Sequence, residues 1–254
     1  MKPLIKKLLT ITLMTFFFAT IHFNVNGQDA PLGHLLSVTE FTVKPGHEVQ
    51  FREGVKAWKA CYLENKGDWT WRLWSRQQGE GSVYVLASDM PNWAEMDKTD
   101  EKGKNCQMLA MSMINPHIEK SSNHITRFQP EISNSKPLEG DIIRVGFYKT
   151  NNTNGHKMME VVKEVEAIRG KAGVNQGYWY SWQSSAPESP TYHFVTGHKD
   201  FAAMDIVQEN VWQTVEKEAG KAKREELQTA FRSSLDKTWS YVYKLDKDIS
   251  RPTK

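Results

Sequence analysis

The residues best suited to chemistry are a histidine and an arginine within aromatic, strand-like segments. His193 directly precedes Phe194, and Arg72 lies between Trp71 and Trp74. A positioned imidazole can act as a general base near neutral pH, and a guanidinium group binds anions and stacks on aromatic rings. We therefore predict His193 and Arg72 as catalytic candidates. The alternatives are a structural histidine with satisfied hydrogen bonds and an arginine that reaches solvent at a sheet edge.

A wall of aromatic and polar side chains is expected beside these two residues. Side chains alternate between the two faces of a strand, so Arg72, Trp74 and Arg76 share one face. If that face lines a cavity, its rings and guanidinium groups suit an anionic or aromatic ligand. The alternative for the aromatic residues is the hydrophobic core. The further ligand-binding candidates in predicted strands are Trp71, Tyr84, His124, Arg144, Trp179, Trp182 and Tyr192.

Motifs of several large enzyme classes are missing from the sequence. It contains no His-Glu-x-x-His, Cys-x-x-Cys, P-loop or Gly-x-Ser-x-Gly motif, and no Gly-x-Gly-x-x-Gly after a strand. Common zinc hydrolases, nucleotide enzymes and α/β-hydrolases need such fixed local geometry and are therefore disfavoured. His47 and His156 each follow a glycine, which indicates a shared loop-to-helix junction rather than a metal site. We predict no metal site and no cofactor.

The first residues have the pattern of a secretory signal peptide. Lys2, Lys6 and Lys7 precede an apolar run over 8–23, and the pattern places cleavage after Gly27. The whole chain has 33 Lys plus Arg against 30 Asp plus Glu, so these three lysines account for the entire excess. The chain after the predicted signal peptide therefore has no net charge, which argues against nucleic acid as a partner. We expect an exported protein, periplasmic or extracellular, with no membrane contact after cleavage; the alternative is an uncleaved anchor.

The chain contains two cysteines, Cys61 and Cys106, and both follow the expected cleavage site. In an oxidising compartment they can form one disulfide. The alternative is two small buried thiols, which cysteine tolerates well.

The sequence repeats itself at an offset of 108 residues. This period is too long for a solenoid repeat and indicates a duplicated domain. A segment rich in Pro, Ser, Asn and Gly predicts a linker. We therefore predict a signal peptide over 1–27, a first repeat over 28–132, a linker over 133–140 and a second repeat over 141–254. The pairs at this offset are Trp71 with Trp179, Trp74 with Trp182, Tyr84 with Tyr192, Trp93 with Phe201, Met96 with Met204, and Asp97 with Asp205.

Periodicity predicts the element order βαββαβ in each half, which is that of a ferredoxin-like unit. The second helical regions are expected over 90–116 and 201–236, and the methionines of the first are expected in the core. A ferredoxin-like sheet carries helices on one face only, so a second copy must cover the other face. The predicted fold class is α+β, with two tandem ferredoxin-like units forming an intramolecular α+β barrel. One tryptophan of each Trp-x-x-Trp pair should then pack beneath the helices, and the other should face the shared interior.

The segment Val43-Lys44-Pro45-Gly46-His47, followed by a helix that contains Phe51, resembles the dimeric α+β barrel superfamily. That group includes the antibiotic-biosynthesis monooxygenase-like and NIPSNAP-like domains. The resemblance covers about 35–132 and 141–249 and implies two units that face each other across their sheets. Because both units lie in one chain, a monomer can close its own barrel. The second half departs from the pattern, since residues 149–154 replace the Pro-Gly turn, and no family catalytic motif transfers.

These observations predict an exported protein that binds a small molecule between its halves. It would act on an aromatic or anionic metabolite without a metal or nucleotide, as monooxygenase-like or isomerase-like relatives do. One alternative is a non-enzymatic interaction or scaffold protein whose outer helices make the contact. Another is a carbohydrate-binding or carbohydrate-cleaving protein with an aromatic groove.

Overall fold

The computed structural model describes residues 33–174, 177–183, 186, 188–207 and 209–252, which belong to one compact unit. The predicted signal peptide over 1–27 lies outside the described residues. No helix within the described ranges is long and apolar enough to cross a membrane.

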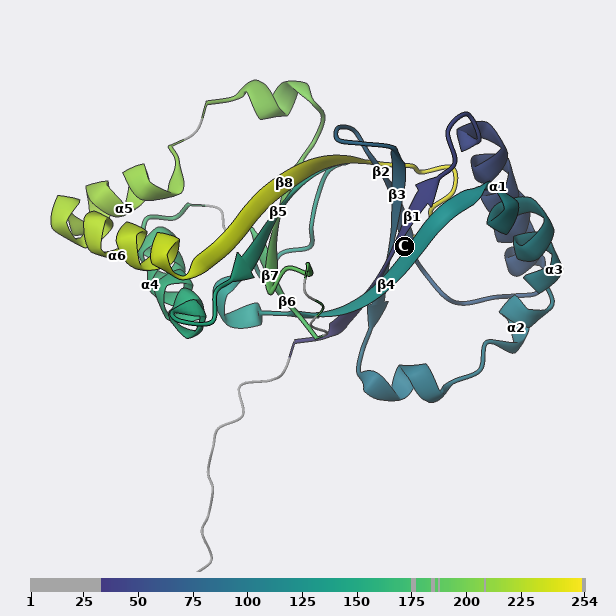
Figure 1. Ribbon diagram of the computed structural model, residues 1–254, viewed down its shortest axis with the longest axis horizontal. Coiled ribbons are helices and arrows are strands. Elements are labelled where there is room, and N and C mark those ends of the chain that lie inside the picture. The colour runs from purple at the N-terminus through teal and green to yellow at the C-terminus, as the bar shows by residue number, and fades with distance from the viewer. Residues whose placement is uncertain (1–32, 175–176, 184–185, 187, 208, 253–254) are drawn as a thin grey trace, which may run out of the picture. The chain divides into compact units, whose positions relative to one another are not determined.

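Eight antiparallel strands close into a barrel (Figure 1). In the first half the neighbours run β4-β1-β3-β2, and in the second half they run β8-β5-β7-β6. The β2–β8 and β4–β6 pairs join the two halves. The strands are β1 (Leu35–Val43), β2 (Arg72–Arg76), β3 (Ser82–Met90), β4 (Ile118–Phe128), β5 (Ile142–Thr150), β6 (Tyr178–Trp182), β7 (Tyr192–His198) and β8 (Leu235–Leu245).

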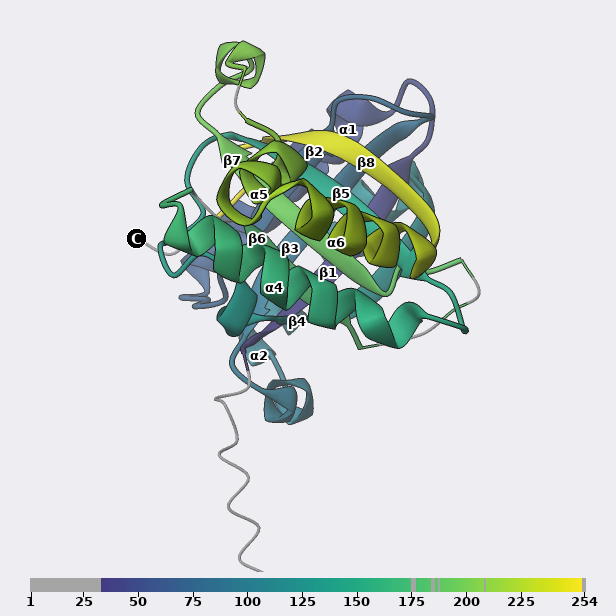
Figure 2. The same ribbon diagram turned by 90° about the vertical axis from the view of Figure 1, so that its left-hand side faces the viewer.

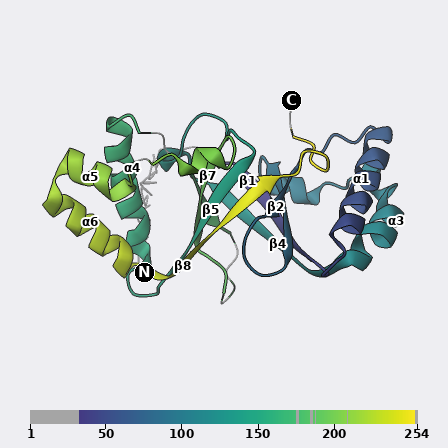
Figure 3. The same cartoon turned by 90° about the horizontal axis from the view of Figure 1, so that it is seen from above.

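The helices flank the strands on two opposite sides, those of the first half on one side and those of the second half on the other (Figure 3). In Figure 2 the second-half helices α4, α5 and α6 lie in front of the strands. The α-helices are α1 (Glu48–Glu64), α2 (Glu101–Lys104), α3 (Gln107–Leu109), α4 (Met158–Lys171), α5 (Val211–Ala219) and α6 (Lys221–Ser233). Short helical turns complete the list: η1 (Trp93–Asp97), η2 (Ala110–Ile114), η3 (Asn115–His117), η4 (Pro130–Ile132), η5 (Gly155–Lys157) and η6 (Ala202–Asp205).

Strand alternation gives every strand one face toward the helices and one toward the barrel interior. In β1, Val43 joins the core beneath α1, whereas Leu36 and Val38 face a cavity inside the barrel. The two tryptophan pairs divide as expected. Trp71 and Trp179 pack on the helix side of the strands. Trp74 and Trp182, three residues later in each pair, line the cavity.

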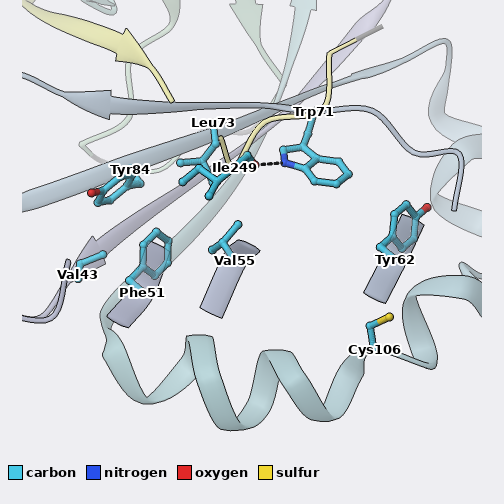
Figure 4. Close-up of a cluster of buried hydrophobic side chains, with 9 residues drawn as sticks. All are labelled: Val43, Phe51, Val55, Tyr62, Trp71, Leu73, Tyr84, Cys106 and Ile249. Atoms are coloured by element: carbon cyan, nitrogen blue, oxygen red, sulfur yellow. Dashed lines mark hydrogen bonds between the residues drawn. The ribbon is translucent and has the colours of Figure 1, made fainter. Parts of the chain in front are cut away.

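The first helix-side core forms around α1 (Figure 4). Phe51 of α1 is fully buried and packs near Tyr84 of β3, with ring centroids 4.9 Å apart. Trp71 donates a hydrogen bond from Nε1 to the backbone oxygen of Ile249 at 2.8 Å, which ties the C-terminal segment to the core. Gly54 allows the close approach of η2 to α1, because a Cβ there would lie 2.1 Å from the backbone oxygen of Met113.

The second helix-side core forms beneath α4. Val162 and Met158 of this helix pack with Trp179 of β6. Glu166 and Arg169 are buried beside them and form an ion pair at 2.8 Å, which satisfies charges that would be costly alone. The pair is therefore a structural element of the α4 face.

The two predicted long helical regions are wrong in detail. Residues 201–236 do not form one helix, because Gly220 adopts a φ of +86° and separates α5 from α6. Residues 90–116 break into η1, α2, α3, η2 and η3. The methionines of that region were expected in the core, but Met108 is 71% exposed and Met111 is 53% exposed. Of these, α3, η2 and η3 pack against α1, and Met108 and Met111 lie on their solvent-facing side.

A disulfide joins Cys61 near the end of α1 to Cys106 just before α3. It closes a loop with a sequence separation of 45 residues. Cys106 directly precedes α3, η2 and η3, so the covalent link holds the start of this run of short helices against α1.

Replacing both cysteines by serine should lower the free energy of unfolding by about 3 kcal/mol, because the bond limits the unfolded chain. Urea unfolding of the double variant and of the oxidised protein measures the difference. Reduction of the unmodified protein should give a similar loss, and equal stability with and without the bond would contradict the assignment.

Candidate functional site

The barrel interior contains a cavity of about 490 Å³. Its walls are mainly apolar and aromatic, with a small number of polar groups, which is the usual character of a small-molecule site. Every strand contributes: Leu36 and Val38 of β1, Trp74 of β2, Val85 of β3, His124 of β4, Val145 of β5, Tyr180 of β6, Val195 of β7 and Tyr243 of β8.

His193 of β7 is a buried polar residue of this cavity, with 6% of its surface exposed. The register of the β6–β7 pair places it opposite Tyr180, and the two rings stack with centroids 4.7 Å apart. Trp182 donates a hydrogen bond from Nε1 to Nδ1 of His193 at 3.0 Å. Burial lowers the pKa of His193 to about 3, so the ring is neutral at physiological pH. A group with so low a pKa is a weak base, which opposes the general-base role suggested by the sequence.

Two tyrosine hydroxyls also belong to the cavity lining. Burial raises the pKa of Tyr180, and the Asp89 carboxylate adds to that rise. Burial likewise raises the pKa of Tyr243, with a further contribution from Glu40. Both hydroxyls therefore stay protonated and can donate a hydrogen bond to a ligand.

His124 also packs against Trp182, with ring centroids 4.4 Å apart. Burial lowers the pKa of His124, while the Glu40 carboxylate opposes the shift. Glu40 also lines the cavity, and over the described parts of the chain it forms no ion pair. This carboxylate makes the interior unfavourable for an anion.

Charged groups gather where β1 and β2 begin and β3 ends. Asp89 lies 3.8 Å from Arg72 and 3.5 Å from His34, and all three side chains are partly exposed. Residues 134–138, between the halves, line the same cavity. The Tyr178 hydroxyl shares its one proton between the backbone oxygens of Lys136 and Pro137, at 3.0 and 2.9 Å, which fixes this segment against β6.

The structure brings five of the predicted site residues into the cavity: Arg72, Trp74, His124, Trp182 and His193. The ligand-binding predictions for six others do not fit their positions. Trp71 and Tyr84 belong to the α1 core, and Trp179 and Tyr192 belong to the α4 core. Arg144 lies on the exposed outer face of β5, opposite the cavity-lining residues on either side of it. Arg76 shares a face with Trp74 but lies beyond the cavity, with its guanidinium 4.7 Å from the Tyr241 ring centroid.

Sequence reasoning missed Tyr180, Tyr243 and Asp89 as lining residues. Tyr180 could have been predicted from the sequence, because it shares a strand face with Trp182. These residues could be predicted only if the sequence showed which face of each strand points into the barrel. It does not show this, because both faces of the strands are buried.

Among the residues that the structure describes, no group of three or more His, Cys, Asp or Glu side chains is placed to hold a metal ion.

No family model matches the chain, and no curated protein matches it in sequence. Solved structures do match. A presumed monooxygenase from Fusobacterium nucleatum is 11% identical, with 84% of this chain and 92% of that chain covered and a TM-score of 0.52. An anthrone oxidase-like protein is 9% identical, with 84% of this chain and 92% of that chain covered and a TM-score of 0.50. A chlorite dismutase variant from Candidatus Nitrospira defluvii is 6% identical, with 85% of this chain and 93% of that chain covered and a TM-score of 0.54. At such identities the likeness establishes the fold alone, which is that of the dimeric α+β barrel proteins.

The buried imidazole predicts a pH dependence of stability. The pKa of His193 in the folded chain, about 3, lies below the value of about 6.5 in an unfolded chain. Below about pH 6.5 the unfolded chain therefore binds a proton that the folded chain does not, and stability falls as the pH falls toward 3. In the His193→Gln variant the free energy of unfolding should fall less steeply with falling pH than in the wild type, by up to about 1.4 kcal/mol per pH unit.

Urea unfolding between about pH 7 and about pH 4 measures these slopes. The control is His156→Gln, which changes an exposed histidine outside the barrel and should keep the wild-type slope. Identical slopes for the wild type and His193→Gln would show that His193 is not held neutral.

Proposed function

We propose that this protein binds a small aromatic molecule in the cavity of its α+β barrel. The observation that carries the proposal is the cavity of about 490 Å³, whose apolar and aromatic walls surround a few polar groups. Such a site takes up most of a small ligand's apolar surface and orients it by a few hydrogen bonds. A cavity within a closed barrel favours this function over the alternatives of a carbohydrate groove and an outer-helix scaffold.

The charges of the lining favour an aromatic ligand over an anionic one. Arg72, the guanidinium expected to attract an anion, lies 3.8 Å from Asp89. Glu40 adds a second carboxylate to the lining. The aromatic rings of Trp74, Tyr180 and Trp182 offer stacking surfaces instead.

We extend the proposal to catalysis, with oxidation of the bound aromatic molecule by dioxygen as the reaction class: a ring methylene becomes a carbonyl, and the second oxygen atom leaves as water. Two of the similar structures support it by their descriptions, one as a monooxygenase and one as anthrone oxidase-like. Anthrone is itself a neutral aromatic ketone of three fused rings, in keeping with the apolar lining.

We also propose that the two halves arose by tandem duplication of one ferredoxin-like unit, related to the monooxygenase-like and NIPSNAP-like domains. The equivalent strand orders β4-β1-β3-β2 and β8-β5-β7-β6 support it, together with the tryptophan pairs at an offset of 108 residues. A chain that supplies both halves can close its barrel as a monomer.

Export is part of the proposal. The lysines and apolar run before Gly27 support a cleaved signal peptide, and the Cys61–Cys106 disulfide suits an oxidising compartment. The mass of the protein isolated from the periplasm or medium should correspond to a chain that begins at Gln28. Recovery of the full-length chain from the cytoplasm would contradict export.

Filling the cavity should abolish binding. Ala87 of β3 lines the cavity, so Ala87→Phe places a ring in the space of the ligand. Calorimetric titration with acetonaphthone, a neutral aromatic ketone, should show at least a tenfold loss of affinity, about 1.4 kcal/mol.

The matched control is Ala60→Phe on the exposed face of α1, which should bind as the wild type does. Equal binding by both variants would place the ligand outside the barrel. Absence of binding by the wild type to this ketone, to ethylnaphthalene and to naphthoate would contradict the proposed function.

A further inference from the structure

We infer that the protein has a metal site outside the barrel, where His47 and His117 together bind one divalent ion of square-planar or tetragonal coordination, Cu²⁺ above all. The two side chains come from the turn before α1 and from η3, 70 residues apart in the sequence. Neither histidine lines the cavity, so this site is separate from the proposed aromatic ligand and does not depend on it.

The two imidazole rings converge on one point. Nδ1 of His47 lies 2.8 Å from Nδ1 of His117, and both side chains are partly exposed. Without a metal this contact is a hydrogen bond, so one Nδ1 carries a proton and the other accepts it. Nε2 of neither ring has a hydrogen-bond partner among the residues that the structure describes. The proton can therefore move to Nε2 of its own ring, which leaves both Nδ1 lone pairs for a metal and releases no proton.

The separation of the two nitrogens matches neighbouring corners of a square. With metal–nitrogen bonds of about 2.0 Å, nitrogens 2.8 Å apart subtend an angle of about 90° at the metal. A tetrahedral ion with the same bond length would place them about 3.3 Å apart. Square-planar and tetragonal geometries are typical of Cu²⁺ and Ni²⁺, and Cu²⁺ binds such ligands more tightly.

Backbone hydrogen bonds hold both histidines in place before a metal binds. The backbone oxygen of Lys44 accepts from the N–H of His47 at 3.0 Å, and the N–H of Lys44 donates to the oxygen of His117 at 2.9 Å. The His47 oxygen accepts from the N–H of Phe51 in α1 at 2.9 Å. Both ligands are thus attached to one residue, and little ordering is left for the metal to impose.

The same connection in the second half shows that the fold does not require the pair. The backbone N–H of Asn151 donates to the oxygen of Ser234 at 3.0 Å, as that of Lys44 does to His117. His156 follows in η5, but the residue before β8 is a serine instead of a histidine. The two connections are built alike, and of the two only the first brings two imidazoles together.

Water would complete the coordination. Within the described ranges no third His, Cys, Asp or Glu side chain is placed to join these two, and the partial exposure of both rings admits solvent. One charge of each sign lies nearby: the Glu48 carboxylate accepts a hydrogen bond from Ser82, and the Lys44 ammonium donates to the backbone oxygen of Pro116 at 2.7 Å. Because these charges offset each other, the imidazoles determine the affinity.

Calorimetric titration with Cu²⁺, in the presence of glycine as a weak competitor, tests the inference. His47→Gln and His117→Gln should each weaken copper binding at least tenfold, because one remaining imidazole cannot chelate. The matched control is His156→Gln, which changes the exposed histidine of the second-half connection and should bind copper as the wild type does.

Electron paramagnetic resonance of the wild type with one equivalent of Cu²⁺ gives a readout that needs no variant. The spectrum should be that of a tetragonal site with two imidazole nitrogens as ligands. A spectrum with no nitrogen ligand or only one would overturn the inference. So would copper affinities that are equal in the wild type and both variants, or a loss in one of the two variants alone, since either result would mean adventitious binding by single side chains.

Discussion

The closure of eight strands into one barrel is the constraint on which the other features depend. Helices cover the outer face of each half, and the inner faces enclose a shared space, so both faces of the strands carry buried side chains. The alternation of side chains then sends Trp71 into the α1 core and Trp74 into the cavity. A shift of register by one residue would exchange the two sets and place Arg72 beneath a helix.

The cavity separates neutral from charged groups along its length. Deep in the barrel, burial keeps His193, Tyr180 and Tyr243 in their uncharged forms. The ion pair of Arg72 with Asp89 lies where the side chains are partly exposed and water can solvate them. This division follows from the high cost of burying an unpaired charge. Glu40 departs from this division, because its carboxylate also lines the cavity and forms no ion pair among the described residues.

The strand and helix pattern of the sequence predicted the α+β barrel, because period-two runs and helical runs alternate clearly. It also predicted that each Trp-x-x-Trp pair would divide between two faces. It could not decide which face was inside, since both are apolar, and Tyr84 and Tyr192 were therefore expected in the cavity although they belong to the helix-side cores. The bond from Trp182 to His193 depends on the register across the β6–β7 pair, which one sequence does not specify.

The segment over 134–138 connects the halves and also forms part of the cavity wall. A barrel closed by two separate chains would have two equivalent ends and no such segment. In this chain the wall exists once, so the two ends of the pocket differ. Having both halves in one chain therefore makes the pocket asymmetric, and an asymmetric pocket allows a single binding orientation. Cutting the chain within this segment would alter the pocket itself, even if the halves stayed associated.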